Sequence, residues 1–300
     1  MPDRKLGLRP AKNAPALAFA SFRAPGIPAH PLAADHLSDV TDFGLYDNDK
    51  YGDCGPTSVA NYIKLVTKAL TGVEVSVSQD DVFDLYRRSG NPGFDPATDA
   101  DDNGVDMQTM LEALAKGGIG GGHKPVAFAK VDPSNLDEVR AAIAIFGGVL
   151  WGVTLDIAQQ VQTDEGGPWD YQRSSIWGGH AVVAGAYTSA PSGTDVSVVT
   201  WGEVLGVTDR FMAHQLGECW VVVMQEHLDH PAFQQGVDVA QLAADYEALT
   251  GRPFPVQPTP EPPAPGPQPV PPTPGPADAD VALGDALRTW LTANGYKPSA

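Results

Sequence analysis

The sequence predicts an α+β fold in which a helical half comes first and an antiparallel sheet follows. Two patterns support this fold class. Between residues 54 and 146, apolar residues recur at the three- and four-residue spacing of helices that bury one face. Between residues 149 and 224, short valine-rich runs are separated by turn-forming segments, as in a sheet. Because 42% of the 300 residues are hydrophobic, the chain is long enough to bury one sizeable core.

Five helices are expected, each from an apolar stripe with a start or stop signal. Ser78 followed by Asp81 is a start signal, and Gly147-Gly148 is a stop signal. Pro56 suits the first turn of a helix beginning at Cys54, since its missing N–H has no partner there. The expected ranges are 54 to about 70, 78 to 88, 105 to 116, 135 to 146 and 237 to 249.

Four strands are expected in the second half, at residues 149 to 155, 181 to 187, 196 to 201 and 219 to 224. Two cysteines in 300 residues do not make a disulfide scaffold. Cys54 and Cys219 are therefore expected to be free, with Cys219 packed beside Trp220 in the last strand.

A cysteine stands where a loop becomes a helix, in the segment Gly52-Asp53-Cys54-Gly55-Pro56. At a helix N-terminus, free N–H groups and the helix dipole favour the thiolate, so the pKa of Cys54 is expected to fall. A thiolate is a nucleophile at neutral pH. The alternative is a buried structural cysteine, which is the commoner role of a single Cys.

A histidine downstream follows two glycines and precedes a buried strand. Gly178 and Gly179 let the backbone pass close to a neighbour, and the small and β-branched residues from 181 to 187 indicate a strand. His180 is then expected at the beginning of that strand, where its side chain can face a cleft. The alternative is an ordinary, partly buried histidine.

These segments together resemble the papain-like cysteine peptidase superfamily. The resemblance rests on the order of three motifs: Asp53-Cys54-Gly55-Pro56-Thr57-Ser58, then Gly179-His180-Ala181-Val182, then Thr200-Trp201-Gly202. The cysteine motif is closer to the C39-like branch. The chain is also similar to papain-like proteins of bacteriophages and bacteria, in which a GGHAV segment precedes a TWG segment. The resemblance covers roughly residues 40 to 230 and implies a helical half that carries the Cys and a sheet half that carries the His.

The resemblance also implies catalytic roles. Cys54 would be the nucleophile and His180 its general base, and Asn48, six residues before the cysteine, would stabilise the oxyanion together with the Cys54 amide. The family's orienting Asn or Asp falls on Val199, which cannot accept a hydrogen bond. That role is then vacant or taken by the hydroxyl of Thr200. No cofactor is implied.

Charge and hydropathy exclude several partners. The formal net charge of −18 argues against nucleic acid, because phosphate binding depends on Lys and Arg. No stretch approaches 18 consecutive apolar residues, and Met1 to Lys5 leads into no hydrophobic signal core. We therefore expect no membrane association and no Sec signal, and a soluble protein that is cytoplasmic or virion-associated.

An acidic segment, Asp99-Ala100-Asp101-Asp102-Asn103-Gly104, matches the first six positions of an EF-hand calcium loop. The twelfth position is Met110 in place of the bidentate Glu. The alternative is a solvated acidic loop in which Asn103 or Asp106 caps the helix that begins near residue 105.

Four regions are expected along the chain. Residues 1–40 hold several prolines and would form an extended arm laid over the main domain, and residues 41–251 would form the papain-like domain. Residues 252–277 form a Pro-rich linker, with 13 prolines between residues 253 and 276. Residues 278–300 would form a short helix with an apolar stripe, made of Leu283, Leu287, Trp290 and Leu291.

Such a helix is too short to be stable alone, so its apolar stripe needs a partner. The partner would be the protein's own body, a second copy or a larger assembly, and we favour an anchoring role. Chance amphipathicity in a frayed tail is the alternative.

The expected function is a cysteine peptidase or amidase that acts on a protein or a cell-wall peptide through Cys54 and His180. Trp177 and Trp201 would shield this pair from water or simply pack in the core. One alternative is an inactive structural or binding protein, such as a phage virion component held by its C-terminal helix. Another is a transglutaminase or acyltransferase that uses the same pair.

Overall fold

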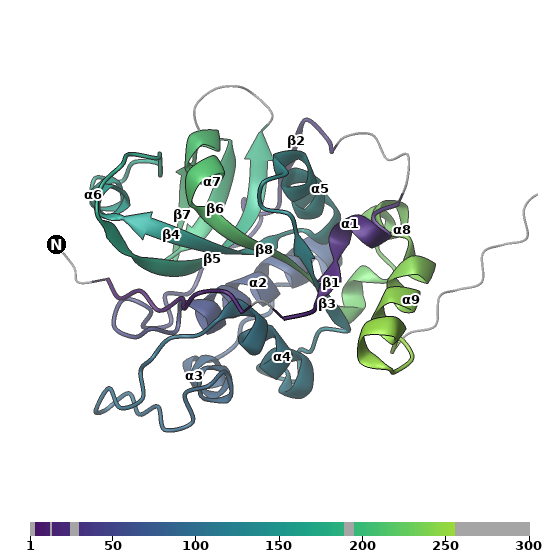
Figure 1. Cartoon of the computed structure of the whole chain (residues 1–300), viewed down its shortest axis with the longest axis horizontal. Helices are drawn as coiled ribbons and strands as arrows, with labels where there is room; N and C mark the ends of the chain where they lie inside the picture. Colours follow the sequence, from purple (N-terminus) through teal and green to yellow (C-terminus); the bar gives the residue numbers. More distant parts are fainter. Residues whose placement is uncertain (1–3, 13, 25–29, 189–194, 256–300) are drawn as a thin grey trace, which may run out of the picture. The chain divides into compact units, whose positions relative to one another are not determined.

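The computed structural model describes residues 4–12, 14–24, 30–188 and 195–255. Within these residues a mixed sheet runs through the molecule, with strand order β1-β3-β8-β4-β5-β6-β7 and with β2 paired to β5 (Figure 1). All neighbouring strands are antiparallel except β1 and β3. The strands are β1 (Leu17–Ala18), β2 (Ala33–Asp35), β3 (Ala127–Val131), β4 (Val149–Asp156), β5 (Ile176–Thr188), β6 (Val196–Thr200), β7 (Glu203–Val207) and β8 (Leu216–Val223).

The helices lie on both faces of the sheet. They are α1 (Phe19–Phe22), α2 (Cys54–Thr71), α3 (Gln79–Arg88), α4 (Met107–Gly117), α5 (Leu136–Phe146), α6 (Ile157–Asp164), α7 (Asp209–Gln215), α8 (Pro231–Gly236) and α9 (Val239–Thr250), with a 3-10 turn, η1, at Gln225–His227. The α+β prediction and its five main helices are confirmed. Ser78 and Asp81 form the capping box of α3.

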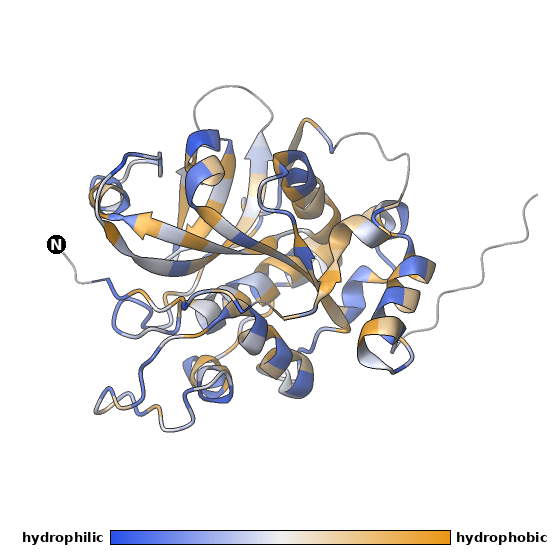
Figure 2. Cartoon of the chain, in the orientation of Figure 1, coloured by the Kyte–Doolittle hydropathy of each residue, from blue (hydrophilic) through white to orange (hydrophobic). Residues whose placement is uncertain are grey.

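Alternate residues of each strand enter two cores. In β8, Val221 and Val223 join the core under α5, α7, α8 and α9, whereas Trp220 and Val222 join the core under α2, α3 and α4. The central strands are accordingly hydrophobic along most of their length (Figure 2). Cys219 is buried in β8, and it is free, as is Cys54, which confirms the prediction of free cysteines. Cys219 does not pack beside Trp220, because neighbouring residues of the strand point to opposite faces and these two enter different cores.

The structure differs from the predicted elements in two ways. The strands β1, β2, β3 and β7 and the short helices α1, α6, α7 and α8 were not predicted, because their short segments carry weak apolar patterns. β5 begins at Ile176, so His180 lies inside the strand, opposite Val153 of β4, and not at its beginning. The glycines before His180 hide this part of the strand from the sequence, since glycine is uncommon in strands.

The segment before residue 40 contacts the main body at several points. β1 pairs with β3, β2 pairs with β5, and Phe19 and Phe22 of the one-turn helix α1 are fully buried in the first core. The expected linker and C-terminal helix lie almost entirely outside the described residues. Among the helices that the structure describes, none is long and apolar enough to cross a membrane.

A buried histidine far from the cysteine makes stability depend on pH. His227 is fully buried; its Nδ1 accepts a hydrogen bond from the Met224 amide, and its Nε2 donates one to the Phe146 carbonyl. Burial lowers the pKa of His227 to about 4. Between pH 6.5 and 4 the unfolded chain therefore binds a proton that the folded chain rejects, so stability falls as the pH falls.

Replacing His227 by glutamine is expected to weaken this dependence. Between pH 7 and pH 5 the wild-type free energy of unfolding should drop by about 2 kcal/mol more than that of His227→Gln. Urea unfolding of both proteins at the two pH values measures this difference. Equal losses in both proteins would show that His227 does not carry the effect.

Candidate active site

Cys54 is the first residue of α2 and is fully buried. The nearby backbone N–H groups of Ala181, Gly7 and Gly55 lower the pKa of Cys54, but burial outweighs them and raises that pKa to about 12. The expectation of a lowered pKa is therefore wrong for this state of the protein. The helix N-terminus does favour the thiolate, but desolvation by the chain that covers the sulfur is larger.

His180 reaches the same place from β5 and is also fully buried. Its Nε2 shares a hydrogen bond of 2.9 Å with the Thr200 hydroxyl, and its Nδ1 has no hydrogen-bond partner among the described residues. Desolvation lowers the pKa of His180 to about 3. The backbone N–H of the next residue, Ala181, is close enough to Cys54 to lower its pKa, so β5 brings His180 into the neighbourhood of the thiol, and both groups are neutral here.

Strand alternation decides which residue meets the imidazole. Val199 pairs with Val183 of β5 and faces the core beneath α2, whereas Thr200, the next residue, turns its hydroxyl to His180. The side chain that meets the imidazole is therefore that of Thr200 and not that of Val199.

Removing that hydroxyl is expected to impair the site. Thr200→Val keeps the side-chain shape but leaves a buried ring nitrogen without a partner, so the protein should lose about 1–2 kcal/mol of stability. Hydrolysis by the active form should fall about ten- to a hundredfold, because a misoriented base transfers protons poorly. Thr200→Ser is the matched control and should retain most activity. Thermal melts and peptide hydrolysis measure the two effects, and a fully active valine variant would exclude the orienting role.

Aromatic rings cover the histidine. The Trp201 ring stacks on the imidazole with centroids 4.4 Å apart, and Trp177 stacks on Trp201 at 5.8 Å. Trp201 adopts a left-handed backbone, with φ 45°, in the turn between β6 and β7. Trp169, which the sequence analysis did not single out, packs edge-on to His180 and Trp201. The two predicted tryptophans therefore lie at the site itself.

Asn48 is buried near Cys54, but its amide is engaged. Its Nδ2 donates to the Asp53 carboxylate at 3.1 Å and to the Tyr51 carbonyl at 3.4 Å. Asp53 is itself fully buried, desolvation raises its pKa well above the usual range, and its second carboxylate oxygen has no partner. Asn48 can therefore serve an oxyanion only after turning away from Asp53.

Part of the expected N-terminal arm, residues Arg4–Lys12, lies across the site as an extended chain. From here on, the arm means these nine residues. The Leu8 amide donates to the Gly179 carbonyl at 3.0 Å, and the Gly7 carbonyl accepts from the Val105 amide at 2.8 Å. Gly179 is on the sheet half and Val105 precedes α4 on the helical half, so the arm bridges the two. The Gly7 backbone N–H is also close enough to Cys54 to lower its pKa, so the arm passes beside the thiol.

Glycines allow this close approach. A β-carbon on Gly179 would lie 2.3 Å from the Leu8 carbonyl oxygen, and one on Gly7 would lie 2.0 Å from the Gly52 carbonyl oxygen. The prediction that the glycines before His180 let a backbone pass nearby is confirmed. The neighbour is the arm.

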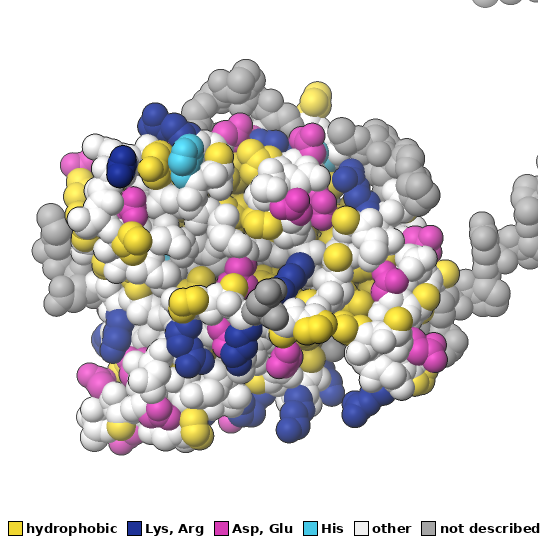
Figure 3. All heavy atoms as spheres, in the orientation of Figure 1, with side chains coloured by type: hydrophobic (Ala, Val, Ile, Leu, Met, Phe, Trp, Pro, Cys, Tyr) yellow, Lys and Arg dark blue, Asp and Glu magenta, His cyan; other side chains and the backbone are white. Residues whose placement is uncertain are grey.

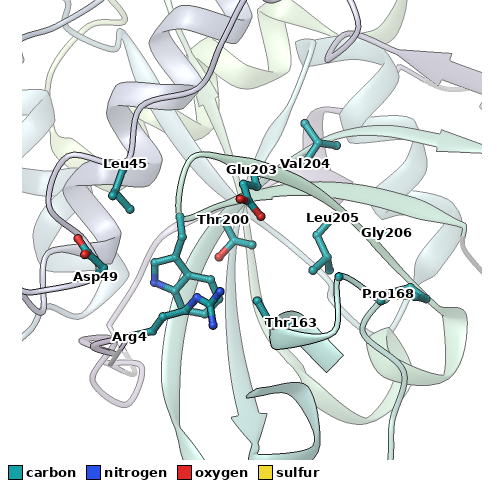
Figure 4. Close-up of a pocket in the computed structure, with 13 residues that line it drawn as sticks. Arg4, Leu45, Asp49, Thr163, Pro168, Thr200, Glu203, Val204, Leu205 and Gly206 are labelled. Carbon is teal, nitrogen blue, oxygen red and sulfur yellow. The ribbon is translucent and has the colours of Figure 1, made fainter. Parts of the chain in front are cut away.

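Side chains of the arm also contact the main body. Arg4 forms an ion pair with Asp164, and its guanidinium carbon lies 5.3 Å from the centroid of the Trp201 ring. Arg4 enters a cavity of about 470 Å³ whose walls include Asp49, Thr163, Thr200 and Glu203 (Figure 4). On the other side of Cys54, Leu8 lines a second pocket of about 340 Å³ together with Gly152, Val153, Gly179 and Glu218.

The acidic segment at residues 99–104 contributes to the contact between the arm and the main body. Asp102 accepts hydrogen bonds from the Gly52 amide at 2.9 Å and from the Tyr86 hydroxyl at 2.6 Å, and it pairs with Lys5 of the arm at 2.5 Å. Asp106 accepts a hydrogen bond from the Thr109 amide and caps α4. This agrees with the prediction that Asn103 or Asp106 caps that helix. No three His, Cys, Asp or Glu side chains within the described part of the chain are placed to hold a metal ion.

No protein-family model matches the chain, and no curated protein matches it in sequence. Solved structures do match it. The fold is that of the papain-like cysteine proteases. Xylellain, a cysteine protease from Xylella fastidiosa, superposes with a TM-score of 0.57 at 13% identity, over 74% of this chain and 96% of xylellain.

Two further papain-like structures agree. The proCathepsin B S9 of Trypanosoma congolense has a TM-score of 0.53 at 12% identity, over 74% of this chain and 87% of that one. The digestive procathepsin L 3 of Tenebrio molitor larval midgut has a TM-score of 0.51 at 13% identity, over 74% of this chain and 76% of that one. The likeness establishes the papain-like fold of this chain.

An N-terminal arm laid over the main domain was predicted, but its position at Cys54 and His180 was not. A signal was present: Arg4, Lys5, Arg9 and Lys12 fall within nine residues that contain no Asp or Glu, in a chain of formal net charge −18. A local run of cations in an acidic protein indicates an attachment to acidic surface.

Proposed function

We propose that the protein is a papain-like cysteine peptidase or amidase whose site is covered by its own arm. One observation carries the proposal. Cys54 starts a helix, and its pKa is influenced by the backbone N–H of Ala181, the residue directly after a histidine whose Nε2 shares a hydrogen bond with Thr200 and whose Nδ1 is buried without a described partner. The Asp53-Cys54-Gly55 sequence supports the C39-like branch of the superfamily.

The chemistry is acyl transfer in two steps. The Cys54 sulfur attacks the substrate carbonyl carbon while His180 takes the thiol proton, and His180 then gives that proton to the departing amine. Water attacks the resulting thioester, His180 removes a proton from the water, and the proton returns to the Cys54 sulfur as the acid product leaves. The Cys54 amide and Asn48, once released from Asp53, would stabilise the oxyanion.

The arm has to leave before a substrate can enter. With the arm in place the pair is a neutral thiol and a neutral imidazole, because both groups are desolvated. Displacing the arm admits water, lowers the pKa of Cys54 and raises that of His180, which together favour the thiolate–imidazolium pair. The covered protein is therefore expected to be inactive and the uncovered one active.

A second candidate is a structural or binding protein that keeps the fold without catalysis, for example a phage virion component anchored through its C-terminal helix. The engaged amide of Asn48 favours it, because the oxyanion site lacks a free side-chain donor in this state.

Hydrolysis separates the two candidates. A full-length variant with a displaced arm, such as Gly7→Ala, is incubated with a mixture of quenched fluorescent peptides and with casein, with and without Cys54→Ser. Cleavage that disappears in the Cys54→Ser protein supports the peptidase. No cleavage by the displaced form, under conditions where it remains folded, supports the binding protein.

A further inference from the structure

The arm and the surface that it covers have opposite charges. The arm carries four cations and no acidic residue, whereas the rest of the chain is more acidic than its formal net charge of −18. Figure 3 shows Lys and Arg side chains following one another along the band that the arm occupies in Figure 1. Where the arm lies on the main body, its cations meet carboxylates of that body.

Three carboxylates make this match specific. Asp164 pairs with Arg4, Asp102 pairs with Lys5, and Asp106 lies 3.4 Å from the Lys12 amine. All three acids are largely buried, with exposed side-chain fractions of 13%, 2% and 3%. A buried carboxylate without a cation is unfavourable, so each of these groups favours a positively charged partner.

The subsite of Arg4 shows the greatest complementarity. The guanidinium lies against the face of Trp201, which also covers His180, and it meets the carboxylate of Asp164. The second oxygen of Asp164 is buried without a partner, so the site can accept a further N–H donor. Aromatic face and carboxylate together select arginine over a neutral side chain.

We infer that the substrate or ligand of this cleft is a basic polypeptide segment, with Arg or Lys on both sides of a small residue that faces Cys54. The word substrate rests on the proposed peptidase function, whereas the binding of a basic segment does not depend on it. The cleft thus selects cationic substrates.

Peptide binding tests this inference apart from catalysis. The protein is the full-length chain carrying Arg4→Gln, Lys5→Gln and Gly7→Ala, to displace the arm, and Cys54→Ala, to prevent cleavage. The probes are two fluorescein-labelled nonapeptides, Arg-Lys-Leu-Gly-Leu-Arg-Pro-Ala-Lys and the same peptide with glutamine at its four cationic positions. Fluorescence anisotropy gives the dissociation constant of each peptide.

The basic peptide should bind at least about tenfold tighter than the neutral one, and its affinity should fall with added salt. Asp164→Asn in the same protein should weaken the basic peptide about tenfold and leave the neutral one unchanged. Asp84→Asn, on α3, removes the same charge outside the contacts of the arm and is the matched control. Equal binding of both peptides, or binding of neither, would overturn the inference.

Cleavage of the two peptides by the form that retains Cys54 reports on the proposed function separately. Hydrolysis without charge preference would refute only the inference. Tight binding of the basic peptide without any hydrolysis would refute only the peptidase.

Discussion

Replacing Gly7 by alanine is expected to raise the rate at which iodoacetamide alkylates Cys54 by about a thousandfold at pH 7. A β-carbon at residue 7 would lie 2.0 Å from the Gly52 carbonyl oxygen, and this neighbour is backbone, which cannot swing aside. The arm must therefore move off the sulfur. Under the arm the pKa of Cys54 is about 12, and an exposed thiol with a pKa near 8.5 holds over a thousand times more thiolate at that pH.

Mass spectrometry with peptide mapping follows the reaction and separates Cys54 from Cys219, which stays buried in β8. Gly93→Ala is the matched control, because a β-carbon there would meet only the Asp101 side chain, at 3.4 Å or more. Its labelling rate should equal that of the wild type. A folded Gly7→Ala protein that labels no faster than the wild type would show that the arm does not shield the sulfur.

His180→Gln, made in the Gly7→Ala protein, is expected to lower peptide hydrolysis about a thousandfold or more. Glutamine retains a polar group that can reach the Thr200 hydroxyl, but it cannot take the thiol proton or return it to the leaving amine. The loss should appear in kcat, since the side chain acts in the chemical steps. Steady-state kinetics with the best peptide substrate measures it.

His214→Gln is the control for this substitution, because His214 is exposed on α7. Its kinetics should match those of the parent protein. If His180→Gln kept the parent kcat while the folded state persisted, another group would be the base, and the assignment of His180 would be wrong.

The helices and their ends were predictable because the relevant signals are local. Capping residues such as Ser78 and Asp106 act within three residues of their own position, and an apolar stripe repeats within one turn. Cys54 and His180 were also found from local features, a helix start and a pair of glycines. Their fold could be recognised from motif order in the chain, although no sequence comparison matches it.

The features of the site that were predicted wrongly depend on contacts between residues that are distant in the sequence. The pKa of Cys54 is raised by burial under segments that are distant in the sequence, so the helix dipole alone predicted the wrong direction. Asn48 is engaged by Asp53 through a loop geometry that no pattern encodes. The beginning of β5 was misplaced because its glycines, which leave room for the close passage of the arm, are uncommon in strands.

The pH dependence of Cys54 alkylation in the Gly7→Ala protein tests the Cys54–His180 pair most directly. A thiolate–imidazolium pair should keep the sulfur reactive at pH 6 and lose reactivity only at lower pH, and His180→Gln should move the profile to that of an ordinary thiol, with a pKa near 8.5. An alkylation rate that falls about tenfold for each pH unit below pH 8, equally with and without His180, would contradict the pair and leave Cys54 an ordinary buried cysteine.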